Sequence, residues 1–212
     1  MKWKVDLHLH TSFSYDGLCS PARVVELSRA RGLSKIAVTD HNTVAGALEA
    51  RKLAPELVIV GEEVRTRRGE LLALFIEEEI PPDLDPLETI RLIREQGGIV
   101  GIPHPFDRIR REAMGPYALE IIEEVDFIEG FNARTVLQAD NAEAMRIAAE
   151  RGIPASAGSD AHTPWEIGTA WVEMDPFGGE KEFLEALRRG RIGGRKSPLW
   201  VHVFSTLAKL RR

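Results

Sequence analysis

Short apolar runs alternate with segments of helical periodicity along most of this chain, and the alternation limits the folds open to it. Strands are expected at 3–9, 35–39, 57–60, 99–102, 126–131, 155–157 and 170–174. Helices are expected at 21–31, 44–53, 86–96, 118–123, 140–151 and 180–189, and a hairpin at 64–76. Repeated strand-then-helix units favour a parallel sheet with helices outside, and six or seven such strands allow a closed barrel.

Ionisable residues gather where the predicted strands end. The groups are His8 with His10, Asp40 with His41, Glu62 with Glu63, His104, Glu129 with Asn132, and Asp160 with His162. In barrels of alternating strands and helices, the carboxyl ends of the strands carry the chemistry. Five of the six histidines occupy these positions, so the set indicates one shared site.

His8 and His10 are two residues apart on the first predicted strand. On an extended strand both imidazoles project from one face, and Val5, Leu7 and Leu9 then face the other way. Two imidazoles on one face are half of a metal site, because two ligands alone hold a divalent ion poorly.

The residue types at the strand ends point to a metal-dependent site. Imidazole together with carboxylate suits zinc, manganese or iron. The single cysteine, Cys19, excludes an intrachain disulfide and argues against a structural zinc site of clustered thiolates. Burying so many ionisable groups without a cation would leave unpaired charge, at a cost of several kcal/mol per ion.

The motifs at the strand ends resemble, in order and spacing, the polymerase and histidinol phosphatase (PHP) superfamily. The resemblance covers residues 5 to 175, and its motifs are His8-Leu9-His10-Thr11, Asp16-Gly17, Thr39-Asp40-His41-Asn42, Gly61-Glu62-Glu63, Ile102-Pro103-His104-Pro105-Phe106 and Gly158-Ser159-Asp160-Ala161-His162. It implies an α/β fold, a distorted (β/α)7 barrel with residues 1–212 as a single PHP domain. It also implies two or three divalent metal ions at the C-terminal ends of the strands, and phosphoester hydrolysis.

The resemblance implies a set of ligands for each ion. The first ion would be held by His8, His10, Glu63 and Asp160. The second ion would be bridged to the first by Glu63 and held by His104. The third ion would be held by Asp16, His41 and His162.

One ligand requires a choice between neighbouring residues, and one position departs from the family pattern. Glu63 is preferred to Glu62 because the family's ligand stands two residues after the glycine, here Gly61. The two glutamates cannot both point inward on an extended segment, so Glu62 is expected to face solvent or to support a ligand. Where some relatives supply a further histidine, this chain offers Asn132 or Glu129, which leaves the second ion less securely held.

A metal-bound water is the expected nucleophile. Divalent ions can lower the pKa of such a water toward ~7, and no serine of the sequence has an evident histidine free to act as its base. Asp40 is expected to orient a ligand or to assist proton transfer. Phosphate recognition requires cations near the barrel mouth, and Arg134, Arg110 and Arg108 follow strand ends there.

Composition restricts the partners of the chain. The 212 residues carry a formal net charge of −5 at pH 7, which argues against long nucleic acid. No apolar run approaches the ~20 residues of a membrane span, and no signal peptide is evident. We therefore expect a cytoplasmic protein that acts on a small phosphorylated substrate. The sequence carries no signal for an oligomeric state.

Three functions fit these expectations. The first is a metal-dependent phosphomonoesterase acting on a small metabolite or nucleotide. The second is a nuclease or exonuclease acting on short oligonucleotides, since metal-centred phosphodiester hydrolysis uses the same groups. The third is a non-catalytic, metal-stabilised binding module, which the replacement of several ligands would have favoured. Hydrolysis of a C–N bond is a minor further option.

Overall fold

A computed structural model describes residues 1–201, 204 and 206. One sheet contains the strands β1 (Trp3–Leu9), β2 (Lys35–Val38), β3 (Val58–Thr66), β4 (Gly69–Leu74), β5 (Ile99–Ile102), β6 (Phe127–Asn132), β7 (Ala155–Gly158), β8 (Ala170–Met174) and β9 (Arg191–Gly194). The helices are α1 (Pro21–Ala30), α2 (Ala45–Leu53), α3 (Pro86–Glu95), α4 (Gln138–Arg151) and α5 (Glu180–Arg188), with two 3₁₀ helices, η1 (Gly115–Leu119) and η2 (Ile122–Glu124).

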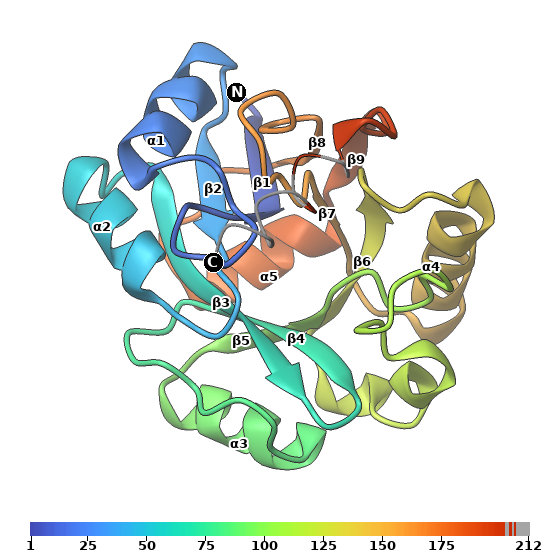
Figure 1. The fold of residues 1–212 in the computed structure, drawn as a ribbon. Coiled ribbons are helices and arrows are strands. Elements are labelled where there is room, and N and C mark those ends of the chain that lie inside the picture. The colour runs from blue at the N-terminus through green and yellow to red at the C-terminus, as the bar shows by residue number, and fades with distance from the viewer. Residues whose placement is uncertain (202–203, 205, 207–212) are drawn as a thin grey trace.

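The sheet curls into a nearly closed barrel (Figure 1). β1, β2 and β3 run parallel, as do β5, β6 and β7, and β4 runs antiparallel between β3 and β5. The first half of β1 pairs with antiparallel β8, to which β9 is added. The end of β1 meets the chain after β7, where His10 N–H donates to the Ala161 carbonyl at 2.9 Å. The predicted distorted barrel of seven strands is therefore confirmed, with β8 and β9 as an extension.

β1 contains a β-bulge that the sequence pattern does not reveal. Four residue steps along β1, from Val5 to Leu9, match three steps along β2. Val5 and Leu7 consequently pack inside the barrel, whereas Leu9 packs outside it with the helices. The prediction that these three side chains share one face was wrong, because the extra residue reverses the alternation after Leu7. His8 and His10 come after the reversal, and their side chains lie together on the side of β1 that faces the site.

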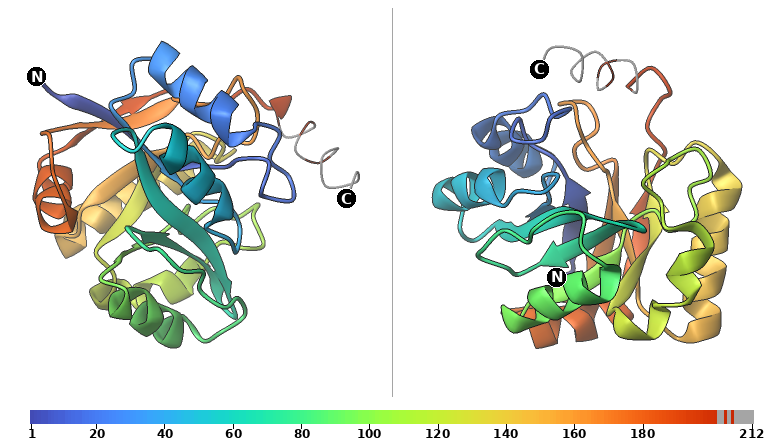
Figure 2. Two further views of the ribbon diagram at one scale, coloured as in Figure 1. Left: turned by 90° about the vertical axis from the view of Figure 1, so that its left-hand side faces the viewer. Right: turned by 60° about the horizontal axis from the view of Figure 1, so that its bottom comes forward.

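Two apolar layers flank the sheet. The outer layer joins the strands to the helices α1 to α4, which surround the barrel (Figure 1). The inner layer fills the barrel and includes Phe183 of α5, which lies across one end (Figure 2). Phe183 contacts Phe127, the first residue of β6, so α5 closes the end where the parallel strands begin. The polar residues are left at the opposite end.

Local sequence signals account for two helix starts. Ser20 Oγ accepts a hydrogen bond from the backbone N–H of Arg23 and so caps α1, which begins at Pro21 as predicted. Asp85 plays the same part at α3, because its carboxylate accepts from the Leu87 N–H at 3.0 Å. Each cap satisfies one N–H group that has no partner within its helix.

Two elements differ from the sequence prediction. The segment expected as a helix at 118–123 forms the two 3₁₀ helices η1 and η2, because it is too short to complete regular α-helical turns. β9 was not predicted, since Gly193 and Gly194 have low strand propensity. Pairing with β8 stabilises this strand in place of its own side chains.

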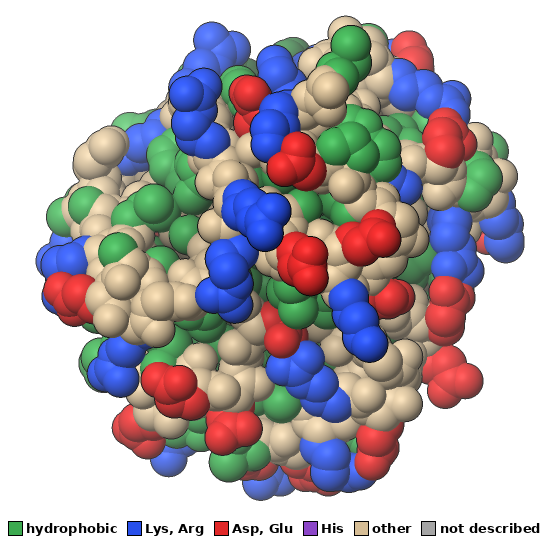
Figure 3. Space-filling view, turned by 180° about the vertical axis from the view of Figure 1, so that it is seen from behind, with side chains coloured by type: hydrophobic (Ala, Val, Ile, Leu, Met, Phe, Trp, Pro, Cys, Tyr) green, Lys and Arg blue, Asp and Glu red, His purple; other side chains and the backbone are tan. Residues whose placement is uncertain are grey.

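The surface mixes both signs of charge. Lys and Arg side chains lie among Asp and Glu on the face seen in Figure 3. Within the described part of the chain, no helix combines the length and the apolar character that crossing a membrane demands.

Candidate metal centre

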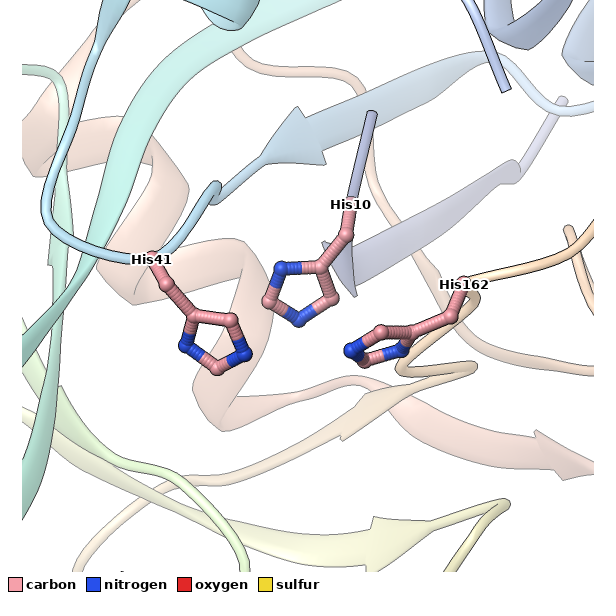
Figure 4. A group of neighbouring side chains, drawn as sticks. All are labelled: His10, His41 and His162. Atoms are coloured by element: carbon pink, nitrogen blue, oxygen red, sulfur yellow. The ribbon is translucent and has the colours of Figure 1, made fainter. Parts of the chain in front are cut away.

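The ionisable residues predicted from the strand ends meet at the end of the barrel opposite α5. His10, His41 and His162 come from three different segments and turn toward one another (Figure 4). The ring centroids of His10 and His162 are 4.1 Å apart, and those of His10 and His41 are 4.5 Å apart. Ligand atoms lie within 4.8 Å of one another in four groups, which are His10–His41–His162, His8–His10–Glu63, His8–His104–Asp160 and His41–Glu63–Glu70.

His8 and His10 present Nε2 to each other at 3.2 Å. Nδ1 of His8 lies 3.2 Å from Glu129 Oε1, a carboxylate oxygen that can only accept. Nδ1 of His10 lies 3.1 Å from Ser14 Oγ, which donates its own proton to Asp40 at 2.7 Å. Both Nδ1 atoms therefore carry a proton, and the Nε2 atoms are the ones turned to the site.

One proton must separate these two Nε2 atoms when no metal is bound. Burial lowers the pKa of His8, but the nearby carboxylates outweigh it and hold that pKa well above its ordinary value. Burial and the neighbouring imidazoles His162 and His41 hold the pKa of His10 well below its ordinary value. A divalent ion that binds both nitrogens would take the place of a proton between them.

Two buried carboxylate oxygens complete this position. Glu63 Oε2 lies 3.3 Å from His8 Nε2 and 3.4 Å from His10 Nε2. Asp160 Oδ1 lies 3.7 Å and 3.3 Å from the same two atoms. Neither oxygen accepts a hydrogen bond from the described residues. Ligands ~2.1 Å from a tetrahedral ion are about 3.4 Å apart, so this donor set fits a divalent cation.

The neighbouring imidazoles and Arg110 favour the charged form of both carboxylates. Burial raises the pKa of Glu63, but the imidazoles of His8 and His41 outweigh it, so the pKa is well below its ordinary value. Burial likewise raises the pKa of Asp160, and the Arg110 guanidinium and His8 lower it further than burial raises it.

His104 meets the other oxygen of Glu63. His104 Nε2 lies 3.0 Å from Glu63 Oε1, and the backbone N–H of His104 donates to Glu129 Oε2 at 2.8 Å. The backbone here is strained, since His104 has φ 29° and Asp160 has φ 52°. Such conformations cost of order 1–3 kcal/mol each and are typical of functional sites.

Asn132 does not offer an oxygen to this second position. Its Oδ1 accepts from the backbone N–H groups of Arg134 and Thr135 at 2.8 Å and 3.2 Å. Its Nδ2 donates to Glu129 at 2.9 Å and to Asp160 at 3.1 Å. A backbone N–H can only donate, so the orientation of the amide is determined. The expected ligation by Asn132 disagrees with this geometry. Glu129, the alternative at this strand end, accepts from Nδ1 of His8 on the side of the ring away from the site.

Asp16, His41 and His162 form the third predicted group. Asp16 Oδ1 lies 3.2 Å from His162 Nε2 and 3.7 Å from His41 Nε2. His162 Nδ1 donates to the backbone carbonyl of Asp160 at 2.8 Å, which leaves Nε2 for a ligand. Tyr15 stacks on His41 with ring centroids 4.9 Å apart.

Asp40 lies behind the imidazoles. Its carboxylate accepts from the backbone and the hydroxyl of Thr11 and from Ser14 Oγ, each at 2.7 Å. Gly46 leaves room for it, because a Cβ there would lie 2.0 Å from Asp40 Oδ2. Asp40 therefore acts on His10 through Ser14, the arrangement expected of an orienting residue.

A cavity of about 460 Å³ opens over the third group. Its wall includes Arg110, whose guanidinium donates to Asp160, and Arg134, whose Nε lies 3.5 Å from Glu166. Arg108 was expected there too, but its exposed guanidinium donates to Asp140 at 2.8 Å. The carboxylate of Asp140, which is buried, pairs with this side chain instead.

Two glutamates differ from the sequence expectations. Glu62 is fully buried on the outer side of β3 and accepts from the Ile80 N–H at 2.9 Å, so the expected exposure to solvent is wrong. Burial raises its pKa to about 8. Glu70 lines the cavity and was missed. Because β4 is antiparallel, its first residues lie at the site, whereas the pattern in the sequence includes only the last residues of strands.

Two known protein families match parts of this chain. The PHP domain family matches residues 6–150, and a PHP-associated family matches residues 138–192. The first match spans more than half of the chain. The chain therefore belongs to the PHP domain family.

Relatives of this chain differ in what is known of them. An uncharacterized protein of Methanocaldococcus jannaschii is 34% identical over 87% of this chain and 79% of its own length. A 5'-3' exoribonuclease of Haemophilus influenzae is 32% identical over 54% of this chain and 47% of its length. A phosphoribosyl 1,2-cyclic phosphate 1,2-diphosphodiesterase of Eggerthella lenta is 38% identical over 36% of this chain and 32% of its length.

Solved structures share the fold. A two-domain protein of Bacteroides vulgatus, described as containing a predicted PHP-like metal-dependent phosphoesterase, superposes with a TM-score of 0.75 at 22% identity. The match covers 92% of this chain and 65% of that protein.

Proposed function

We propose that the chain is a metal-dependent phosphomonoesterase acting on a small phosphorylated metabolite or nucleotide. The observation that carries the proposal is the grouping of imidazoles and carboxylates at one cavity whose wall contains Arg110 and Arg134. A cavity of about 460 Å³ falls within the size range of small-molecule sites.

Two or three divalent ions, of zinc, manganese or iron, would be held by the predicted ligands without Asn132. The first would lie among His8, His10, Glu63 and Asp160, the second between Glu63 and His104, and the third among Asp16, His41 and His162. Bound ions supply a nucleophilic water of lowered pKa and offset the charge that develops on phosphoryl oxygens. Glu129 and Ser14 keep the imidazoles of His8 and His10 oriented through Nδ1.

The arginines would recognise the phosphoryl group. Guanidinium pairs with phosphate oxygens in a forked geometry, and Arg110 and Arg134 reach the cavity from the loops after β5 and β6. Arg110→Ala should lower kcat/KM by about 10- to 100-fold, because a hydrogen bond to a charged group contributes ~1.5–3 kcal/mol. Steady-state kinetics with the exposed Arg111→Ala as the control checks this, and equal values for both variants would contradict the role.

Metal-stripped protein provides the decisive test. The protein is treated with a chelator, dialysed, and supplied with manganese or zinc before assay on mononucleotides, sugar phosphates and an aryl phosphate. Turnover of monoesters should return with the metal, and His41→Ala should abolish it. Full activity in protein shown by elemental analysis to lack metal would refute the proposal.

A second candidate is the removal of nucleotides from a short oligonucleotide. It is favoured by the 32% identity with a 5'-3' exoribonuclease. The net charge of −5 and the interspersed charges in Figure 3 weigh against a long polynucleotide. The same assay with a 5'-phosphorylated trinucleotide and an aryl phosphodiester distinguishes the two, since only a nuclease would prefer the diesters.

A further inference from the structure

A second cavity, of about 480 Å³, lies beside β8 and apart from the metal centre. Its wall includes Arg31, Trp165, Thr169, Trp171 and Arg195. Arg31 directly follows α1, Trp171 belongs to β8, and Arg195 directly follows β9. Among the described residues, none that lines this second cavity also lines the cavity over the metal centre. Its volume falls within the range of small-molecule sites.

The charge of the second cavity is positive. Two arginines border it, and no carboxylate does so in the described part of the chain. Neither Arg31 nor Arg195 pairs with a carboxylate among the described residues. The whole chain carries a net charge of −5, so this local excess of cations distinguishes the second cavity and favours an anionic ligand.

Both arginines are attached to one turn, residues 164–169. The guanidinium of Arg31 donates to the backbone carbonyl of Pro164 at 2.8 Å and to that of Ile167. The backbone N–H of Arg195 donates to the Thr169 carbonyl at 2.8 Å. Partial burial lowers the pKa of Arg31, and the charge of Arg195 also lowers it. An anion bound between the two guanidinium groups would relieve their repulsion.

The buried hydroxyl of Thr169 is a further polar group at the wall of the second cavity. It has no hydrogen-bond partner among the described residues. Buried polar atoms normally have a partner in the protein or in a bound molecule, so a partner-free hydroxyl beside a cavity is typical of a site that a ligand or water completes.

An exposed indole forms another part of the wall. Trp165 is 54% exposed, although it rests against Trp200 and Phe204 with ring centroids 5.5 Å from each. Trp200 and Phe204 also contact each other, so the three rings form one aromatic cluster. The contacts hold the Trp165 ring in place and leave about half of it open for stacking on a planar ring such as a nucleobase.

We propose that the second cavity binds a nucleotide, with its base stacked on Trp165 and its phosphate between Arg31 and Arg195. A nucleotide combines the planar ring and the negative charge that this wall can recognise. The site goes beyond the proposed function, because it uses no residue of the metal centre.

A free nucleotide and one unit of an oligonucleotide offer the same chemical groups to the second cavity. The aromatic cluster adjoins both cavities, because Trp200 directly follows Leu199, which lines the cavity over the metal centre. The experiment therefore includes both kinds of ligand.

Calorimetry of metal-free protein in the presence of chelator measures the binding of adenosine 5'-monophosphate, adenosine and inorganic phosphate. The nucleotide should bind at least about 10-fold more tightly than either of the other two, because stacking and hydrogen bonds to charged groups both contribute. Equal affinity for the nucleotide and for inorganic phosphate would overturn the stacking of a base. Absence of saturable nucleotide binding would overturn the inference as a whole.

Variants locate the bound nucleotide. Arg195→Ala and Trp165→Ala should each weaken binding by about 10-fold or more. Arg191→Ala, at an exposed arginine of β9, is the matched control and should leave the affinity unchanged. Arg110→Ala should leave it unchanged as well, because Arg110 lines the other cavity. Loss of binding in Arg110→Ala with none in Arg195→Ala would overturn the inference and leave the proposed function standing.

Tryptophan fluorescence gives a second measurement in a conservative variant. A base stacked on Trp165 should quench the fluorescence of the wild type and of Arg191→Ala, and it should quench Trp165→Phe less. Equal quenching in all three proteins would place the base away from Trp165 and overturn the inference.

A 5'-phosphorylated trinucleotide distinguishes the two sources of the ligand. A strand that spans both cavities should bind more tightly than adenosine 5'-monophosphate, and Arg110→Ala should weaken only the trinucleotide. Equal affinity for the two ligands, with no effect of Arg110→Ala on either, would identify a site for the free nucleotide. Trinucleotide binding that is insensitive to Arg195→Ala would overturn the inference for an oligonucleotide.

Discussion

At the scale of single residues, the centre depends on what lies behind each imidazole. Glu129 holds His8, Ser14 holds His10, and the Asp160 carbonyl holds His162, in each case through Nδ1. This common arrangement leaves Nε2 facing the site and selects one tautomer in advance. The partners are a carboxylate, a hydroxyl and a backbone carbonyl, so no single residue type marks them in the sequence.

Glu129→Gln should weaken metal binding by about 10- to 100-fold, the usual effect of losing a partner behind a ligand. Glu129 accepts from His8, from the His104 N–H and from Asn132, and a glutamine NH₂ group would face one of these donors. Competition with a fluorescent manganese chelator measures the dissociation constant. Glu123→Gln, on the exposed surface, is the control, and an unchanged constant in Glu129→Gln would contradict the role.

At the scale of elements, close approach between strands decides which side chains can meet. A Cβ on Gly158 would lie 2.3 Å from His8 Cβ and 2.5 Å from Glu129 Oε1. The glycine at the end of β7 therefore allows β1 to close the barrel while Glu129 contacts His8. The β1 bulge and the antiparallel β4 are the other two features that direct side chains into the site.

Gly158→Ala should lower the free energy of unfolding by about 1–3 kcal/mol, the range of overpacked substitutions. Gly179→Ala is the matched control, because a Cβ there meets no heavy atom within 4 Å. Urea unfolding of both variants with chelator present measures the difference without a contribution from metal. Equal midpoints would show that the barrel closes without this close approach.

At the scale of the whole molecule, barrel closure brings together residues separated by most of the chain. The backbone N–H of Asp160 donates to the His8 carbonyl at 2.7 Å, so the first and seventh strands meet beside the metal centre. Ions bound there would connect the first strand of the barrel with the chain that follows the seventh. Their contribution to stability follows from binding to the folded state alone.

Chelation should therefore lower the unfolding temperature. One ion at 100 times its dissociation constant contributes ~2.7 kcal/mol, or about 5–10 °C for a chain of this length. Calorimetry with and without chelator measures the shift. His10→Ala should show a smaller shift because its first ion position is incomplete, and an equal shift would indicate that the ions bind elsewhere.

The order of elements and the main members of the centre were determined by the sequence alone. Alternating apolar runs and helical periodicity are local properties that can be read from the sequence. In such barrels the strand ends carry the chemistry, so histidines at predicted strand ends, such as His104 and His162, indicate the site.

Tertiary structure alone decided the rest. The face on which Val5 and Leu7 lie depends on a bulge that only strand pairing defines, and Arg108 turns to Asp140 because a helix brings that carboxylate near. Asn132 and Glu70 are the clearest case. The amide oxygen of Asn132 accepts from backbone N–H groups, and Glu70 lies at the site because β4 runs antiparallel to β3. Neither fact is encoded in the spacing of residues.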